Sequence, residues 1–494
     1  MTQPVFIGID VGTSSVKVIA VDPSGKLLAT AASPLEITRP QPGWSEQNPE
    51  DWWIGSCLAL RRCIDIIGSP EILSIGLSGQ MHSLVPLDKN GAVVRPAILW
   101  NDVRTTGEVE SIRKKIGNHS LRRLTGNPAL EGFTAPKLMW VRDNEPDCFN
   151  RFTQILLAKD YIRFRLTGEL STDPSDASGT LLFDVAGGNW SEEMCSSLGI
   201  DSRMLPPITG SSNIAGNVTK KAASQTGIPA GVTVVTGGSD NACAAVGAGV
   251  VSPGNALITI GTSGAVVAVT DTAVSDAEMR VHSMCHALPS TWYLMGVVLS
   301  AGASLDWWRW TSGRADYNDL VREAEHVEVG SGGVTFLPYL NGERTPHADA
   351  DARSVFLGMH AGIERGHMTR AVLEGVSYAL KDSLELMNPL GVNPVRAVAV
   401  GGGAKSPVWL HILSDVLNLE LRTVGPSEGA PLGAAMLAAV GHGAFCSPED
   451  AVESWLFDLE TIEPDPSVLE QYAGGYDRYV SLYPLLKPVF TSNV

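Results

Sequence analysis

The chain has 494 residues, of which 44% are hydrophobic, so it is long enough to form two or three domains with sizeable cores. Its 36 basic and 53 acidic side chains give a formal net charge of −17, which argues against nucleic acid and anionic membrane surfaces as partners. Seven cysteines without a C-x-x-C pair, the lack of an apolar run of membrane-spanning length, and a strand pattern that leaves no room for a signal peptide predict a cytoplasmic protein.

Alternating aliphatic residues near the start of the chain predict three consecutive strands, at residues 5–10, 16–22 and 27–33. The first two strands are joined by a tight turn at Gly12, Thr13 and Ser14. Backbone N–H groups and hydroxyls point outward in such a turn, and its glycine lets a ligand come close, which suits a phosphate group. Asp10 ends the first strand, where a carboxylate can hold a metal ion that bridges phosphates. An ordinary hairpin is the alternative, which one such turn does not exclude.

The next segments predict a helix and a buried strand. Asn48 is a good N-cap, and the proline and two acidic residues after it predict a helix over residues 49–67. A strand is predicted at residues 72–77, and the Gly-Gln-Met-His segment follows it. Met81 and His82 are therefore expected just beyond the carboxyl end of a buried strand.

A long segment then separates two further predicted strands, at residues 97–100 and 232–236. Residues 105–230 combine helical patterns with Gly, Pro and Ser, and we interpret them as an insertion. After the second of these strands, two glycines and a serine lead into an alanine-rich helix. Asp240 is thus expected at a strand-to-helix junction, facing whatever binds above the strand ends. The Pro and Gly of residues 251–254 indicate a domain boundary.

The second half of the chain repeats this plan. A second Gly-Thr-Ser turn, at Gly261, Thr262 and Ser263, follows the first by 249 positions. Asp10 of the first copy is matched by Thr259 in the second, so only the first half supplies a carboxylate there. The repeat indicates two similar domains, each with a hairpin suited to phosphate. Further strands are predicted at 255–261, 264–270 and 397–400, and helices at 301–312, 363–388, from 407, and at 431–440 as the last one.

Several motifs occur in an order typical of one family of sugar kinases. They are Asp10–Ser15, Trp44–Trp53, Gly79–His82, Gly238–Asn241 and Gly401–Ser406. On these motifs the chain resembles the FGGY carbohydrate kinases from about residue 5 to about residue 439, and within that family it is most similar to the xylulokinases. The resemblance implies an α/β fold with two ribonuclease-H-like (actin-like) ATPase domains and a ligand cleft between them.

The resemblance also implies a division of the chain. Residues 1–250 are expected to form an N-terminal FGGY kinase domain with the sugar site, the catalytic base, the first phosphate hairpin and the insertion. Residues 251–445 are expected to form a C-terminal FGGY kinase domain with the second phosphate hairpin and the adenosine site. Residues 446–494 remain as a C-terminal extension.

By the same resemblance, Asp240 is the catalytic base, and Met81, His82 and Asn241 contact the sugar. An aspartate with an ordinary, low pKa is ionised near neutral pH, as a base must be. From the residues alone, a helix cap is the alternative for Asp240, and a structural hydrogen-bonding group is the alternative for His82. Trp100 can offer a flat apolar face to the sugar, with packing in the core as its alternative.

ATP is expected to bind at both hairpins and at the glycine-rich turn after the strand at 397–400. The expected nucleotide contacts are Gly12, Thr13, Ser14, Gly261, Thr262, Ser263, Gly302, Gly402, Gly403 and Ser406. A run of glycines lets the backbone lie against a purine or ribose. The resemblance also implies Mg²⁺, with Asp10 as its ligand. Neither a P-loop motif nor a Rossmann motif is present, so the two hairpins would replace them.

Two motifs receive no role from the sequence. His282 and His286 have metal-like spacing, but no third ligand lies near them in the sequence and the family has no zinc, so a metal site is not favoured. The segment Gly342–His347 matches a loop of the family, and its residue types do not reveal a chemical role.

The sequence therefore predicts an ATP-dependent kinase that phosphorylates the terminal hydroxyl of a ketopentose, converting D-xylulose and ATP to D-xylulose 5-phosphate and ADP. Kinases for ribulose, gluconate or glycerol are alternatives within the family. An actin-like structural or regulatory ATPase is the alternative from another class, although it would not require the Gln-Met-His and Gly-Ser-Asp-Asn motifs. The expected partners are the sugar and ATP, and a homodimer is compatible with the resemblance.

A hydrolase is a further alternative. The segment Gly425–Gly429 matches G-x-S-x-G between a predicted strand and a predicted helix. A hydrolase of that type needs an acid and then a histidine downstream, and here only His442 follows, with the one intervening acid directly beside the serine. We set this alternative aside.

Overall fold

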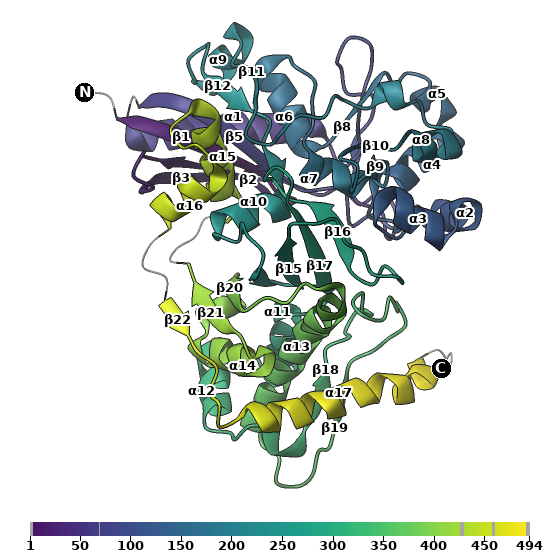
Figure 1. The fold of residues 1–494 in the computed structure, drawn as a ribbon, viewed down its shortest axis with the longest axis vertical. Coiled ribbons are helices and arrows are strands. Elements are labelled where there is room, and N and C mark those ends of the chain that lie inside the picture. The colour runs from purple at the N-terminus through teal and green to yellow at the C-terminus, as the bar shows by residue number, and fades with distance from the viewer. Residues whose placement is uncertain (1–2, 69, 425–428, 457–459, 491–494) are drawn as a thin grey trace.

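The structure is a computed structural model and describes residues 3–68, 70–424, 429–456 and 460–490. It contains two large mixed sheets with helices packed on them, and Figure 1 shows the first sheet in the upper half of the molecule and the second below it. The predicted α/β fold with two similar halves is confirmed. Ser427 of the G-x-S-x-G segment lies outside the described residues.

The first sheet has seven strands with β5 near its centre. Its strands are β1 (Pro4–Val11), β2 (Ser15–Val21), β3 (Leu27–Pro34), β5 (Glu71–Gly79), β11 (Ile214–Asn217), β12 (Thr233–Val235) and β13 (Gly238–Ser239). The first three form an antiparallel meander, and β5 runs parallel to β1, with β12 and β13 parallel to β5. Helix α1 (Pro49–Ile67) packs on β2 and β3, and the Asn48 side chain caps it by accepting a hydrogen bond from Glu50 N–H at 3.1 Å. The predicted order of elements is confirmed here.

The second sheet has the same plan. Its strands are β14 (Asn255–Ile260), β15 (Gly264–Thr270), β16 (His282–Cys285), β17 (Trp292–Val298), β20 (Arg396–Val400), β21 (Glu420–Thr423) and β22 (Glu460–Ile462). Strands β14, β15 and β17 form the antiparallel meander, and β20 and β21 add parallel strands beside β14. Because β14 pairs with β20 as β1 pairs with β5, the two Gly-Thr-Ser turns occupy equivalent positions. The helices of this half are α11 (Gly302–Thr311), α12 (Tyr317–Glu325), α13 (Arg365–Met387) and α14 (Pro407–Leu417).

The segment interpreted as an insertion folds mainly into short helices beside the first sheet (Figure 1). They are α2 (Thr106–Ile116), α3 (Asn118–Thr125), α4 (Thr134–Asn144), α5 (Pro146–Phe149), α6 (Ala158–Thr167), α7 (Pro174–Ala177), α8 (Glu192–Leu198) and α9 (Lys220–Thr226). The strand predicted at 97–100 is shorter in the structure, because β7 (Ala97–Ile98) pairs only with the two residues of β4 (Glu46–Gln47). The remaining short strands are β6 (Val85–Leu87), β8 (Gln154–Leu156), β9 (Phe183–Asp184), β10 (Asn189–Trp190), β18 (Thr335–Leu337) and β19 (Val355–Leu357).

Two helices connect the halves. Helix α10 (Asp240–Gly247) and helix α15 (Ala430–His442) pack against each other, and α15 also packs on β1 and β5 of the first sheet. Glycine permits this close contact: a Cβ on Gly76 of β5 would lie 1.8 Å from the carbonyl oxygen of Ala434. Helix α15 comes from the second half of the sequence but completes the first sheet's core. The predicted domain division at residues 250 and 445 remains a prediction.

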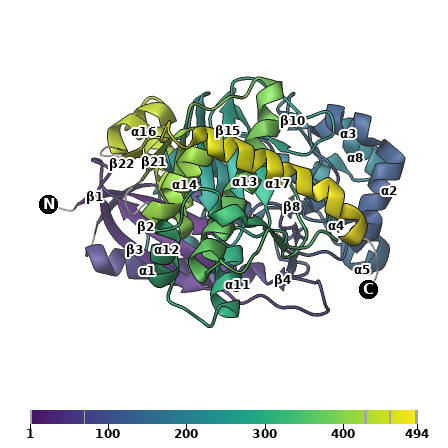
Figure 2. The ribbon, with the colours of Figure 1, turned by 90° about the horizontal axis from the view of Figure 1, so that it is seen from below.

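The chain continues beyond α15, which the sequence predicts as the last helix. Helix α16 (Pro448–Trp455) follows, and then α17 (Leu469–Phe490), which runs across the side of the molecule seen in Figure 2 and packs against α13 and α14. The prolines inside α17 argue against a helix in sequence-based prediction. Packing outweighs this preference, since Tyr472 and Tyr479 are both buried in the core of the second half.

Candidate functional site

The carboxyl ends of β1, β5 and β13 meet at one edge of the first sheet. Ser78 on β5 pairs with Asp10 on β1 and with Gly238 on β13, so these two strands flank β5 at the same level. Neighbouring strands lie about 4.8 Å apart, so the residues at these strand ends are close together. Asp240 follows β13 directly, and Met81–His82 follows β5. The structure thus brings the predicted base, metal ligand and sugar contacts to a single edge.

Asp240 is the first residue of α10 and is half-buried. Its Oδ1 accepts hydrogen bonds from the N–H of Asn241 at 2.7 Å and from Asn241 Nδ2 at 3.1 Å. Ser239 is the N-cap, since its Oγ accepts a hydrogen bond from Ala242 N–H at 3.4 Å. Burial, and then the neighbouring Asp10, raise the pKa of Asp240 to about 7. The expectation of an ordinary low pKa is therefore wrong, because this carboxyl holds its proton part of the time at neutral pH.

Asp10 lies at the end of β1 with one oxygen atom unsatisfied. Within the described ranges, its buried Oδ1 has no hydrogen-bond partner, and burial raises the pKa of Asp10 to about 6. Two half-buried carboxyls side by side each disfavour the ionisation of the other. A divalent cation would bind the unsatisfied oxygen and remove that repulsion, so the residues fit Mg²⁺. Thr259, at the equivalent place on β14, brings no charge.

Met81, His82 and Asn241 lie together, as predicted. Asn241 Nδ2 is 3.7 Å from Met81 Sδ. His82 has a φ of 69°, in the left-handed region that residues other than glycine seldom adopt, and such backbone is frequent at functional sites. Its Nδ1 is 2.5 Å from the carbonyl oxygen of Gly179, which can only accept, so Nδ1 carries the proton. Burial, and more weakly Lys137 and Arg344, lower the pKa of His82 to about 3. The ring is therefore neutral, and Nε2 is a hydrogen-bond acceptor.

Trp100 connects this edge to the first hairpin. Its indole is 43% exposed, and its Nε1–H donates to Thr13 Oγ1 at 2.9 Å. Thr13 Oγ1 in turn donates to Gln80 Oε1 at 3.1 Å. Packing in the core is thus not what holds Trp100, and a broad part of its ring faces solvent. Its role toward a sugar remains a prediction.

A cavity of about 590 Å³ lies at the equivalent edge of the second sheet. The predicted nucleotide contacts that line it are Gly261, Thr262, Gly302, Gly402, Gly403 and Ser406. Leu305, Val321 and Trp409 add apolar walls, which suit the flat ring of a purine. A second cavity of about 620 Å³ adjoins it and shares Thr262 and Gly302. Of the other predicted contacts, Ser263 is not among the described lining residues, and Gly12, Thr13 and Ser14 belong to the first hairpin.

The loop Gly342–His347, to which the sequence gives no role, places the charge of Arg344 near His82 and His282. Thr345 fixes the loop to β17: its N–H donates to the Val297 carbonyl at 3.1 Å, and its Oγ1 accepts from Val297 N–H at 3.0 Å. The charge of Arg344 is close enough to contribute to the lowered pKa of His82. The second half of the chain therefore supplies a cation beside residues of the first. No local pattern in the sequence indicates this, because the contact depends on how the two sheets are arranged.

The rings of His282 and His286 are both hydrogen-bonded within the chain. His282 Nδ1 is 3.2 Å from Asn127 Oδ1, and His286 Nε2–H donates to the carbonyl of Val250 at 3.2 Å. Burial lowers the pKa of His282 to about 3 and that of His286 to about 4. Across the described part of the chain, no three His, Cys, Asp or Glu side chains are grouped so as to hold a metal ion.

None of the helices described is both long and apolar enough to cross a membrane.

Comparisons with known proteins cover nearly the whole chain. Residues 5–247 match the family model of the N-terminal domain of the FGGY family of carbohydrate kinases, and residues 256–442 match that of its C-terminal domain. The chain is 39% identical over 489 residues to the xylulose kinase of Bacillus subtilis, covering 98% of both chains. It matches the crystal structure of the xylulose kinase from Rhodospirillum rubrum with a TM-score of 0.92 at 31% identity, covering 98% of this chain and 99% of that one. The gluconate kinase from Lactobacillus acidophilus matches with a TM-score of 0.94 at 26% identity, covering 99% of each chain.

Proposed function

The chain belongs to the FGGY family of carbohydrate kinases, and on that basis we propose that it transfers the γ-phosphoryl group of ATP to the terminal hydroxyl of a ketopentose, D-xylulose. Kinases of this family use ATP as the phosphoryl donor, and the products here would be D-xylulose 5-phosphate and ADP. The observation that carries the proposal is the half-buried Asp240 at the start of α10, beside Asp10 and Asn241 at the edge where β1, β5 and β13 end. Its pKa is raised to about 7. A general base works best with a pKa near the operating pH.

In this mechanism the Asp240 carboxylate accepts the proton of the terminal hydroxyl while the hydroxyl oxygen attacks the γ-phosphorus. The bond between that phosphorus and the oxygen of the β-phosphate breaks, and ADP leaves with its electron pair. The protonated Asp240 then releases its proton to solvent. The neutral His82 would accept a hydrogen bond from a sugar hydroxyl at Nε2, and Asn241, the Met81 backbone and the face of Trp100 would complete the sugar site.

Asp10 is the proposed ligand of Mg²⁺, supported by the unsatisfied buried Oδ1. When bound, the ion neutralises phosphate charge that the acidic chain would otherwise repel. The N–H groups of residues 13–14 and 262–263 would contact phosphate oxygens from the two sheets, while the N–H groups of Gly12 and Gly261 close their turns by donating to the carbonyls of Ser15 and Ser263. The cavity lined by Gly402, Gly403 and Trp409 would hold the adenosine, because it combines flexible backbone with an apolar wall.

D-xylulose is proposed as the substrate because the 39% identity to a xylulose kinase extends over the whole chain. Similarity of fold does not select the sugar, since a gluconate kinase has a TM-score of 0.94. Ribulose, gluconate and glycerol therefore remain the alternatives to test. Family membership leaves the actin-like structural ATPase without support. A cytoplasmic location and a homodimer are also part of the proposal, and both rest on the sequence and the resemblance.

A coupled ADP-release assay with D-xylulose, D-ribulose, gluconate and glycerol tests the proposal directly. We expect the highest kcat/KM with D-xylulose, and little ATP hydrolysis without a sugar. A higher kcat/KM with another of these compounds would replace the substrate within the family. ATP hydrolysis that no sugar stimulates would contradict the proposed function altogether.

A further inference from the structure

A buried cluster of charged side chains lies behind the junction that carries Asp240, and the mechanism above does not use it. We call it the Lys159 cluster; it consists of Lys159, Asp160, Arg163, Asp173 and Asp176, all of them fully buried. Lys159 Nζ lies 2.6 Å from Asp160 Oδ1, 3.0 Å from Asp173 Oδ1 and 3.4 Å from Asp176 Oδ2. Arg163 Nη1 adds a second ion pair with Asp160 Oδ1 at 2.9 Å. Helix α6 and the start of α7, two segments of the insertion, are thereby fixed to each other.

The charges of the Lys159 cluster come close to balancing. It contains two cations and three carboxyls, and burial together with the neighbouring carboxylates raises the pKa of Asp176 well above its ordinary range. With Asp176 protonated, two positive charges face two negative ones. Within the described residues Arg163 Nε and both carboxyl oxygens of Asp176 have no hydrogen-bond partner, so the cluster is held by the ion pairs of Lys159 and Arg163. Removing a charged partner from these pairs would leave an uncompensated buried charge. The cluster also lies against β5: a Cβ on Gly79 would be 3.1 Å from the backbone nitrogen of Lys159.

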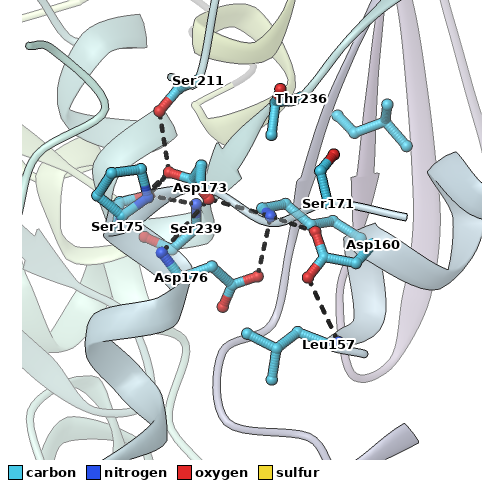
Figure 3. Close-up of polar contacts among 12 residues, drawn as sticks. Leu157, Asp160, Ser171, Asp173, Ser175, Asp176, Ser211, Thr236 and Ser239 are labelled. Carbon is cyan, nitrogen blue, oxygen red and sulfur yellow. Dashed lines mark hydrogen bonds and ion pairs between the residues drawn. The ribbon is translucent and has the colours of Figure 1, made fainter. Parts of the chain in front are cut away.

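One serine joins the Lys159 cluster to the junction. Ser175 Oγ donates a hydrogen bond to Asp173 Oδ2 at 2.5 Å and accepts one from the N–H of Ser239 at 2.9 Å (Figure 3). A hydroxyl has one proton to donate and lone pairs to accept, so one side chain can make both bonds. Ser239 is the residue directly before Asp240. We propose that Ser175 is a positioning residue, through which the Lys159 cluster fixes the Asp240 carboxylate in its reactive place.

The position of Asp240 depends strongly on its backbone. Among the described residues, its carboxylate has hydrogen bonds only from the adjacent Asn241, which moves with it. Displacing a reacting group by about 1 Å can lower a rate by about 100-fold, so a base held this way needs a fixed junction. The pairing of β13 with β5 fixes one side of this junction, and the bond from Ser239 N–H to Ser175 adds a second fixed point from outside α10. The inference rests on the proposed function, because it takes Asp240 as the base.

Ser211 offers a matched control. Its Oγ also donates to Asp173 Oδ2, at 2.9 Å, and it is buried like Ser175. In the described chain its hydroxyl has no direct hydrogen bond to Ser239 and reaches it only through Asp173 and Ser175 (Figure 3). Ser175→Ala and Ser211→Ala therefore each remove one donor to the same carboxylate, but only Ser175→Ala releases the N–H beside Asp240.

The experiment compares these two variants by kcat, by KM for D-xylulose and ATP, by calorimetric affinity for D-xylulose and by Tm. For Ser175→Ala we expect kcat to fall about 10- to 100-fold, because the base is displaced in the transition state. Sugar affinity should change by less than about threefold, because the sugar contacts stay in place. Ser211→Ala should keep most of the wild-type kcat, with a similar Tm.

Equal kcat losses in the two variants would overturn the inference, and so would a loss of sugar affinity as large as the loss of kcat. Asp240→Ala is measured beside them to separate the proposed base from the proposed positioning residue. If Asp240→Ala keeps its kcat, the proposed base is wrong. If Asp240→Ala is inactive while Ser175→Ala behaves like Ser211→Ala, the proposed function stands and the positioning role of Ser175 fails.

A second variant covers the case in which Ser175→Ala does not fold. Ser175→Cys keeps a side chain of similar size with a weak donor and a weak acceptor. We expect kcat to fall for this variant as well, by a smaller factor, with sugar affinity retained. A folded Ser175→Cys protein with the kcat of the wild type would contradict the positioning role.

Discussion

The two Gly-Thr-Ser hairpins share a backbone plan and differ in their surroundings. In the first, Thr13 is held by other side chains: its Oγ1 donates to Gln80 at 3.1 Å and accepts from Trp100 at 2.9 Å. In the second, Thr262 lines two adjoining cavities, while its carbonyl accepts from Ala301 N–H at 3.0 Å. The first hairpin is thus joined to the proposed sugar site, and the second is open to a larger ligand.

The charges beside the two hairpins differ as well, and they fit the same division between a sugar site and a nucleotide site. Asp10 and Asp240 give the first sheet two half-buried carboxyls with raised pKa values, whereas the second sheet has the neutral Thr259 at the equivalent strand position. One duplicated fold can in this way divide a reaction between its halves. The side with carboxyls can hold a cation and take a proton, and the neutral side with a glycine-lined cavity can bind a nucleotide.

The largest effect on kcat is expected from Asp240→Ala, at the edge of the first sheet. General acid–base assistance is typically worth about 10²- to 10⁴-fold, so kcat should fall by that order. Calorimetric affinity for D-xylulose should weaken much less, because the base acts mainly in the transition state. A variant that keeps more than about a tenth of the wild-type kcat would exclude Asp240 as the base.

Beside the second hairpin, Gly402→Val should raise the KM for ATP and leave the KM for D-xylulose unchanged. In the described chain no atom lies within 4 Å of a Cβ at Gly402, so the new side chain would extend into the cavity that this glycine lines. Overpacking of about 1–3 kcal/mol should raise the KM for ATP about 10- to 100-fold, with the KM for D-xylulose unchanged. Gly107→Val is the control, since a Cβ there also meets no described atom and α2 is remote from the cavity lining. A rise in the KM for the sugar would contradict the separation of the two sites.

A smaller effect, again on the first side, is expected from His82→Ala. Loss of one neutral hydrogen bond is worth about 1 kcal/mol, so the KM for D-xylulose should rise about fivefold while the KM for ATP stays the same. Because the pKa of His82 is lowered to about 3, its ring should not titrate in the working range of pH. The wild-type KM for D-xylulose should therefore show no transition near pH 6.5 that is absent from the pH profile of His82→Ala. Such a transition would contradict the neutral His82.

The smallest effect concerns stability and a carboxyl on the second side. Burial raises the pKa of Glu343 to about 8, and in the described part of the chain its Oε2 has no hydrogen-bond partner. The folded protein therefore keeps a proton on Glu343 that the unfolded chain releases above its ordinary pKa. This contribution to stability is fully present at low pH and is lost as pH rises toward 8. Glu343→Gln should match the wild-type Tm near pH 5 and exceed it by a few degrees near pH 9.

Glu374 provides the contrast for that test. It is also buried with a raised pKa, but it is paired with Arg370 at 2.9 Å and accepts from Ser331 Oγ at 2.7 Å. Glu374→Gln should lower the Tm throughout this pH range, because it leaves Arg370 without its buried partner. Parallel Tm curves for Glu343→Gln and the wild type would show that the Glu343 carboxyl is not held protonated.

The sequence predicts most reliably what short segments decide for themselves. The strands β1 to β3 follow from alternating aliphatic residues, and α1 begins where Asn48 supplies its cap. Features that join distant segments could not be predicted. The raised pKa of Asp240 depends on burial and on Asp10 from another strand. Lys159 and Ser175 have no motif of their own, and only the folding of the insertion against β13 connects them to the site.

Asp10→Asn is the sharpest test of the division of labour between the hairpins, because it keeps the size of the side chain and removes its charge. The measurement combines kcat with two calorimetric titrations, D-xylulose without nucleotide and ADP without magnesium. We expect kcat to fall by at least about 100-fold, because charge neutralisation at the phosphates is worth several kcal/mol. Both titrations should match those of the wild type. Sugar binding that weakens as severely as turnover would contradict the assignment of Asp10 to metal and phosphate.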